Sequence, residues 1–172
     1  MPESQLLATG IVTWDDLKQA PGFPGEKRLK EGPVAVIECL QQIPCNPCEE
    51  ACPYGAISVG EPITNLPRLA ADKCRGCGLC IPACPGQAIF VVDNTLSGTE
   101  AAVSFPFEFL PVPKPGQRVA VVNRAGEVVG EGNVTRVLNP PKYDRTMVVT
   151  VAVPKSLADE VRGIALPANT SL

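Results

Sequence analysis

The sequence predicts an α+β chain in three parts. These are an N-terminal extension (1–32), a cysteine-rich domain (33–96) and a small C-terminal antiparallel β-barrel or sandwich (97–172). Two observations carry the prediction: all eight cysteines lie between Cys39 and Cys84, and β-branched residues become frequent from Ser97 onward. A chain of 172 residues is long enough for one ordinary domain or two small ones.

The N-terminal extension contains one predicted short helix, over 13–18. Thr13 is a good N-cap, acidic residues follow in the first turn, and the proline- and glycine-rich run 21–25 ends the helix. Two interpretations stay open for its aromatic residues. Trp14 and Phe23 either anchor a partner-docking arm or pack on the core of the chain itself.

Histidine is absent from the chain, whereas cysteine occurs eight times. The lack of histidine excludes Ser-His-Asp and Cys-His catalysis, haem held by histidine, Rieske centres and mixed Cys/His zinc sites. The first residues have neither the basic nor the apolar segment of a secretory signal, so we expect a cytoplasmic protein. Disulfides are rare in that reducing compartment, and we therefore expect the thiolates to bind metal.

Charge disfavours two classes of partner. The net charge is −3, from 15 basic and 18 acidic residues, whereas nucleic acids and anionic membranes attract clustered lysine and arginine. The longest uncharged stretch, 76–92, is short and broken by proline and glycine. We therefore expect neither nucleic-acid binding nor a membrane span.

The cysteine-rich part contains an internal repeat. A shift of 32 positions superimposes Cys45, Cys48, Cys52 and Pro53 on Cys77, Cys80, Cys84 and Pro85. With Cys74 in front, the second copy reads C-x2-C-x2-C-x3-C-P, the bacterial pattern for 4Fe-4S clusters. In the first copy, five residues separate Cys39 from Cys45, where the second copy has two.

On these motifs, the chain from Pro33 to Asp93 resembles the bacterial dicluster ferredoxin family. The resemblance implies two 4Fe-4S clusters related by a pseudo-twofold axis, across which strands at 32–37 and 88–92 pair. The implied ligands of cluster I, here the cluster I cysteines, are Cys39, Cys45, Cys48 and Cys84. Those of cluster II, the cluster II cysteines, are Cys52, Cys74, Cys77 and Cys80. The longer gap after Cys39 leaves open that this residue is not a ligand.

Zinc is the main alternative cofactor, because two sites of four cysteines each would also use all eight thiolates. Structural zinc sites usually combine two C-x2-C pairs that lie a dozen or more residues apart. A third cysteine close behind each pair, followed by proline, does not suit that arrangement and favours iron–sulfur clusters. A disulfide framework is the third interpretation.

The C-terminal part is predicted to be rich in strands. Strands at 118–122 and 127–138 flank the turn 123–126, a third strand covers 146–153, and a short helix covers 155–162. This part has no cysteine and no acid–base pair that suggests catalysis. Its basic residues either dock an acidic partner or form an ordinary charged surface; they are Arg118, Arg124, Arg136, Lys142 and Arg145.

These features predict an electron carrier that is not an enzyme by itself, because two complete sets of four cysteines leave no open iron site. The extension and the β region favour a fixed subunit of a larger oxidoreductase over a freely diffusing ferredoxin. More loosely, the layout resembles small iron–sulfur subunits of flavin-dependent amino-acid or amine dehydrogenases, which implies flavoprotein or other redox subunits as partners. A redox- or iron-sensing module, or a structural iron–sulfur or zinc module, is the remaining alternative. Because Lys73 and Arg75 flank Cys74, we expect cluster II to have the higher reduction potential.

Overall fold

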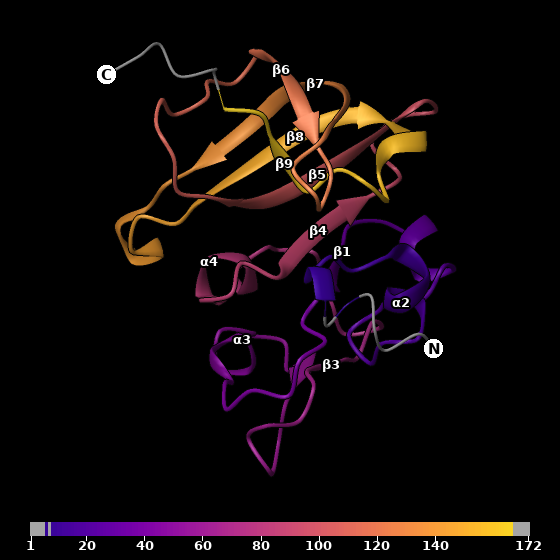
Figure 1. Cartoon of the computed structure of the whole chain (residues 1–172), viewed down its shortest axis with the longest axis vertical. Helices are drawn as coiled ribbons and strands as arrows, with labels where there is room; N and C mark the ends of the chain where they lie inside the picture. The colour runs from indigo at the N-terminus through magenta and orange to yellow at the C-terminus, as the bar shows by residue number, and fades with distance from the viewer. Residues whose placement is uncertain (1–5, 7, 167–172) are drawn as a thin grey trace.

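The computed structural model describes residues 6 and 8–166. Within them, one antiparallel sheet runs through the molecule in the order β1-β4-β5-β8-β7-β6-β9, and β2 and β3 form a separate pair (Figure 1). The strands of the large sheet are β1 (Val34–Ile37), β4 (Ile89–Asp93), β5 (Glu100–Phe107), β6 (Arg118–Val122), β7 (Val128–Leu138), β8 (Met147–Pro154) and β9 (Gly163–Ile164). The small pair is β2 (Ile57–Ser58) with β3 (Arg68–Leu69).

The helices are short. The α-helices are α2 (Trp14–Lys18), α3 (Pro47–Glu50) and α4 (Cys80–Ala83), and the 3-10 helices are η1 (Arg28–Lys30), η2 (Pro141–Tyr143) and η3 (Lys155–Leu157). Figure 1 shows α3 and α4 on the side of β1 and β4 that faces away from β6 and β7. The cysteine-rich part and the strand-rich part therefore occupy opposite ends of the molecule.

The predicted N-terminal helix is confirmed, together with its cap. The Thr13 hydroxyl accepts the N–H of Asp16 at 3.2 Å, and the Asp16 carboxylate accepts the N–H of Thr13 at 3.0 Å. Trp14 and Phe23 meet edge to face at 5.3 Å between ring centroids and pack against the core. Both aromatic side chains thus pack within the chain, in line with the second interpretation.

The strands on either side of the cysteines pair as the family resemblance implies. β1 and β4 run antiparallel, from Val34 opposite Val92 to Ile37 opposite Ile89. All four residues of β1 and the first four of β4 are buried, so apolar contacts as well as ladder hydrogen bonds hold this pair. The pair lies next to the cysteine loops and contributes residues to the lining of both cysteine cavities.

The sheet continues without a break across the boundary expected at residues 96 and 97. β4 pairs with β5, with Val91 opposite Ser104, and β5 pairs with β8 along its whole length. Side chains from β5 to β8 meet in a second apolar core; its fully buried members include Phe105, Val121, Val134, Val149 and Val151. The cysteine-rich and strand-rich parts therefore share one sheet and contribute two adjoining cores.

The structure differs from the expected C-terminal helix. Instead of a helix over 155–162, it has the single 3-10 turn η3, and Ser156 makes no capping hydrogen bond. The N–H of Arg162 donates to the Val122 carbonyl at 2.9 Å, which draws the chain onto β6 before a second helical turn can form. The hairpin expected around 123–126 is confirmed, since β6 and β7 pair on either side of it.

Candidate metal centres

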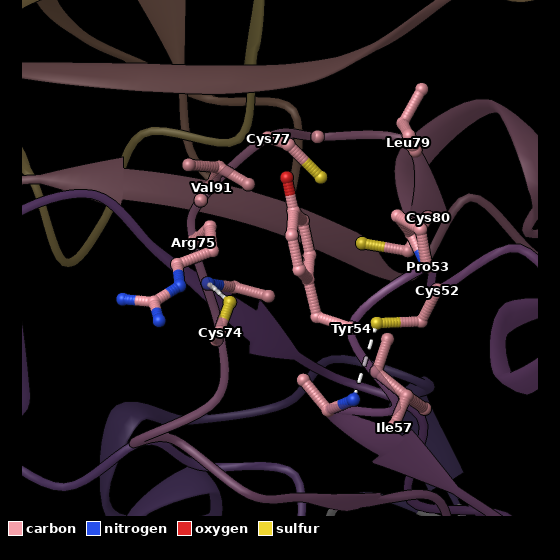
Figure 2. Close-up of a pocket in the computed structure, with 14 residues that line it drawn as sticks. Cys52, Pro53, Tyr54, Ile57, Cys74, Arg75, Cys77, Leu79, Cys80 and Val91 are labelled. Carbon is pink, nitrogen blue, oxygen red and sulfur yellow. Dashed lines mark hydrogen bonds between the residues drawn. The ribbon is translucent and has the colours of Figure 1, made fainter.

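The four cluster II cysteines line one cavity, here called cavity II. About 330 Å³ of empty space lies between Cys52, Cys74, Cys77 and Cys80, together with Tyr54 and several apolar side chains. Figure 2 shows the four cysteine side chains arranged around this space, with Tyr54 among them. Cys74 and Cys80 are buried, Cys52 is half-buried and Cys77 is exposed, so this cavity opens to solvent beside Cys77.

A tight loop brings Cys74 and Cys77 to cavity II. Gly76 and Gly78 both have left-handed φ values, of +63° and +76°. A Cβ at Gly76 would lie 2.5 Å from the Cβ of Pro33 and 2.6 Å from its carbonyl carbon and oxygen. Only glycine therefore allows this loop to pass so close to the segment that leads into β1.

The four cluster I cysteines line a second cavity, cavity I. It is lined by Cys39, Cys45, Cys48 and Cys84, and its empty space of about 480 Å³ is partly open to solvent. Cys39 lies two residues after the end of β1, and the five residues between it and Cys45 form the wider loop that the sequence predicted. Cys39 thus lies with the other three cysteines of its implied set.

Each cavity receives one cysteine from the other half of the repeat. α3 contains Cys48, which lines cavity I, and is followed by Cys52, which lines cavity II. α4 begins with Cys80 of cavity II and is followed by Cys84 of cavity I. The two helices lie side by side, so the crossed arrangement joins the two cavities through short stretches of chain.

Backbone N–H groups point at three of the sulfur atoms. Ala56 donates to Cys52 Sγ at 3.3 Å and Ala88 donates to Cys84 Sγ at 3.4 Å, and these two contacts are equivalent under the 32-residue shift. Ala35, in β1, donates to Cys74 Sγ at 3.4 Å. Such donors stabilise negative charge on sulfur.

The cavities are unfavourable for thiolates that lack a cationic partner. Burial, with a further contribution from neighbouring cysteines, raises the pKa of Cys48 to about 11 and that of Cys80 to about 12. Burial likewise raises the pKa of Cys39, with a contribution from Cys84. Bound iron would supply the missing positive charge, and each thiol that coordinates it would lose its proton. Four sulfur donors around an apolar cavity therefore fit an iron–sulfur cluster.

The cysteine side chains are not gathered around one point, as the ligands of a single metal ion would be. Among the residues that the structure describes, no three histidine, cysteine, aspartate or glutamate side chains lie in a group that could hold a single metal ion. A structural zinc site would need four thiolates within about 2.3 Å of one ion.

A buried ion-pair cluster that the sequence did not predict lies beside Cys39. The Glu38 carboxylate accepts from Arg124 at 2.7 and 2.8 Å and from Arg162 at 2.6 Å. Burial lowers the pKa of Arg162, while the charge of Glu38 opposes that effect. Arg124 is thus mostly buried, whereas the other four basic residues noted in the C-terminal part are exposed.

Comparison with known proteins agrees with the cysteine chemistry. Residues 39–88 match the family described as a 4Fe-4S dicluster domain. Similar proteins include an uncharacterized ferredoxin of Methanocaldococcus jannaschii, 38% identical over 69 residues, which are 39% of this chain and 42% of the relative. Another is a subunit of the Na⁺-translocating ferredoxin:NAD⁺ oxidoreductase complex of Acetobacterium woodii, 40% identical over 45 residues (26% of this chain, 13% of the relative).

A longer match, with lower identity, is to Protein Pixie of Drosophila melanogaster, 28% identical over 126 residues. It covers 66% of this chain and 20% of that protein. A match to a translation initiation factor of Saccharomyces cerevisiae, 25% identical over 173 residues, covers 83% of this chain and 28% of that relative. The chain thus spans between 20% and 28% of the relatives with the longest matches. No solved structure matches the chain.

Together, the domain match over residues 39–88 and the eight cysteines identify a 4Fe-4S dicluster domain with two 4Fe-4S clusters. In the described part of the chain, none of the helices has the length and apolar character that a membrane crossing needs.

Proposed function

We propose that the chain is a fixed electron-relay subunit of a larger oxidoreductase and is not catalytic by itself. In this proposal cluster I is held by Cys39, Cys45, Cys48 and Cys84, and cluster II by Cys52, Cys74, Cys77 and Cys80. One observation carries the ligand assignment: each cavity is lined by one complete set of four cysteines, and each set includes one cysteine from the other half of the repeat.

The residues around the cavities suit such a relay. A bound 4Fe-4S cluster accepts and returns a single electron. The buried strands β1 and β4 fix the cysteine loops, and the apolar lining limits access of water to the buried cysteines Cys48, Cys74 and Cys80. The N–H groups of Ala35, Ala56 and Ala88 stabilise the negative charge on sulfur.

A fixed subunit is favoured over a freely diffusing ferredoxin by the rest of the chain. The N-terminal segment packs on the cysteine-rich part, and the strands from β5 to β9 extend its sheet, which gives a surface well beyond what the clusters need. One relative is a subunit of a redox complex. We propose a flavoprotein as partner, such as an amino-acid or amine dehydrogenase, on the layout of the sequence.

The ligand assignment is tested by two matched variants, Cys39→Ser and Cys77→Ser, purified anaerobically. We expect Cys39→Ser to alter the EPR signal of one cluster and Cys77→Ser to alter that of the other. About eight iron and eight sulfide ions per unmodified chain are expected. Unchanged spectra in Cys39→Ser would remove this residue from cluster I, and zinc without acid-labile sulfide would overturn the iron–sulfur assignment.

The subunit role is tested separately, by the native mass of the protein from its source. Co-elution with a flavin-containing chain is the expected result. A monomer near the chain mass of 18.1 kDa that exchanges electrons with several soluble partners would instead identify a free ferredoxin.

A further inference from the structure

Arg28, in the N-terminal segment, is tied to the loop that carries Cys74. Its Nε donates to the Ala71 carbonyl at 3.1 Å, and its Nη2 donates to the Cys74 carbonyl at 2.9 Å. These acceptors lie 43 and 46 residues away along the chain. A guanidinium group can make such contacts because its donors form a rigid planar fork.

The same side chain also holds the segment before β1. Nη1 donates to the Gly32 carbonyl at 3.1 Å, and Nη2 donates to the Pro33 carbonyl at 3.0 Å. One half-buried arginine thus joins two backbone segments through four hydrogen bonds. Both segments belong to cavity II, because β1 supplies Ala35 and the loop supplies Cys74.

The two clamped segments meet at a sulfur atom. Two residues after Pro33, the Ala35 N–H donates to Cys74 Sγ at 3.4 Å. Arg28 therefore holds the donor strand and the acceptor loop of one N–H···S contact. The close passage of Gly76 over Pro33 shows how little space separates these segments.

Arg28 also brings a charge that its hydrogen bonds do not neutralise. All four of its acceptors are carbonyl oxygens, and none of the ion pairs found among residues 6 and 8–166 involves it. A positive charge next to a cluster ligand favours the reduced, more negative state. In a half-buried position this charge is screened less than that of an exposed lysine.

We propose that Arg28 is a positioning residue for cluster II. It fixes the Ala35 N–H against Cys74 Sγ, and with its positive charge it raises the reduction potential of this cluster relative to cluster I. The inference rests on the proposed ligand assignment. It places part of the redox tuning on an arginine outside the cysteine motif, in addition to the expected contribution of Lys73 and Arg75.

The test compares Arg28→Gln, Arg28→Lys and the control Lys27→Gln. Lys27 is 94% exposed and precedes Arg28 directly, so its replacement removes one positive charge from the same turn without touching the Cys74 loop. The potentials of both clusters are measured by anaerobic redox titration with EPR. Exchange of the Ala35 amide with deuterium is measured on the same samples.

We expect Arg28→Gln to shift the electron distribution between the clusters about tenfold toward cluster I, which is about 59 mV for one electron. Arg28→Lys keeps the charge but loses the fork, so its shift should be smaller. The Ala35 amide should exchange faster in both Arg28 variants. Lys27→Gln should leave both readouts as in the unmodified protein.

The inference would be overturned if Arg28→Gln had the same cluster reduction potentials as the unmodified protein. It would also be overturned if Lys27→Gln shifted the cluster II potential as much as Arg28→Gln does. If Arg28→Gln loses cluster II, the iron content should fall by about half while cluster I stays, which supports the positioning role. If that variant fails to fold, Arg28→Lys decides: an unmoved cluster II potential with unchanged Ala35 exchange refutes the proposal. Failure of the ligand assignment is distinct, because the serine variants report it without involving Arg28.

Discussion

At the scale of single residues, the loop that carries Cys74 and Cys77 depends on two positions that favour glycine. Gly76 combines a left-handed backbone with direct contact to Pro33, whereas Gly78 has the same backbone region with only Ile81 Cδ1 nearby, at 3.6 Å from a Cβ. The two glycines thus separate backbone strain from steric overlap. A side chain at position 78 meets the strain alone, and one at position 76 meets both.

We expect Gly78→Ala to lower the apparent free energy of unfolding by about 1 kcal/mol, the usual cost of a left-handed alanine. Gly76→Ala should lower it by about 3 kcal/mol, because the loop must also move off Pro33. Cluster II should be lost from Gly76→Ala before cluster I. Anaerobic guanidinium unfolding and iron analysis measure both effects, and equal costs for the two variants would contradict the role given to Pro33.

At the scale of elements, the sequence predicted strands well where the apolar pattern was uninterrupted. The regions of β1, β4, β6, β7 and β8 were expected, but β5 was not. Pro106 lies inside β5, and proline normally argues against a strand interior. It is tolerated because β4 pairs with β5 only from Ala102 to Ser104, so no ladder bond to β4 is lost at Pro106.

The candidate site likewise contains residues that the sequence pattern reveals and residues that it does not. Its eight cysteines could be found from the sequence, because their spacing is local and the repeat marks it twice. Arg28 and Glu38 could not be found, since their contacts with the Cys74 loop and with the β region join residues 43 to 124 positions apart, and no local pattern records such contacts. The short helix expected at the C-terminal side failed for a similar reason: a long-range bond from Arg162 to β6 overrides the local preference.

The pairing of β5 with β8 contains a buried polar contact that can be measured. The hydroxyl groups of Ser104 and Thr150 lie 2.8 Å apart on opposite residues of the two strands, both nearly inaccessible to solvent. We expect Ser104→Ala to lower the free energy of unfolding by about 1–2 kcal/mol, because it leaves the Thr150 hydroxyl without this partner.

The double variant Ser104→Ala/Thr150→Val removes both hydroxyl groups and should be more stable than the sum of the single changes predicts, by about 1 kcal/mol. Denaturant midpoints of the four proteins complete this cycle. Strictly additive effects would mean that the two hydroxyl groups do not stabilise the β5–β8 pairing through each other.

At the scale of the whole molecule, one buried ion-pair cluster connects all three parts of the chain. Glu38 follows β1, Arg124 lies in the β6–β7 turn, and Arg162 precedes β9. Both guanidinium groups also lie over the ring of Trp14, at 5.7 and 5.8 Å from its centroid. The N-terminal segment, the cysteine-rich part and the β region therefore meet at this cluster, one residue away from Cys39.

Removal of the Glu38 charge should consequently weaken the whole chain and not one part of it. Glu38→Gln leaves Arg124 and Arg162 buried without their carboxylate, and we expect a loss of about 3 kcal/mol in the free energy of unfolding. The control Glu131→Gln breaks the exposed pair with Arg118 and should cost less than about 1 kcal/mol.

Two probes report on different parts in the same unfolding experiment. Fluorescence of Trp14, the only tryptophan, follows the N-terminal segment, and visible absorbance follows the clusters. In Glu38→Gln both midpoints should fall together, because the ion-pair cluster joins the N-terminal segment to the sheet that carries the cysteine loops. A midpoint that falls only in fluorescence would mean that the N-terminal segment unfolds independently of the sheet, despite its contacts with the ion-pair cluster.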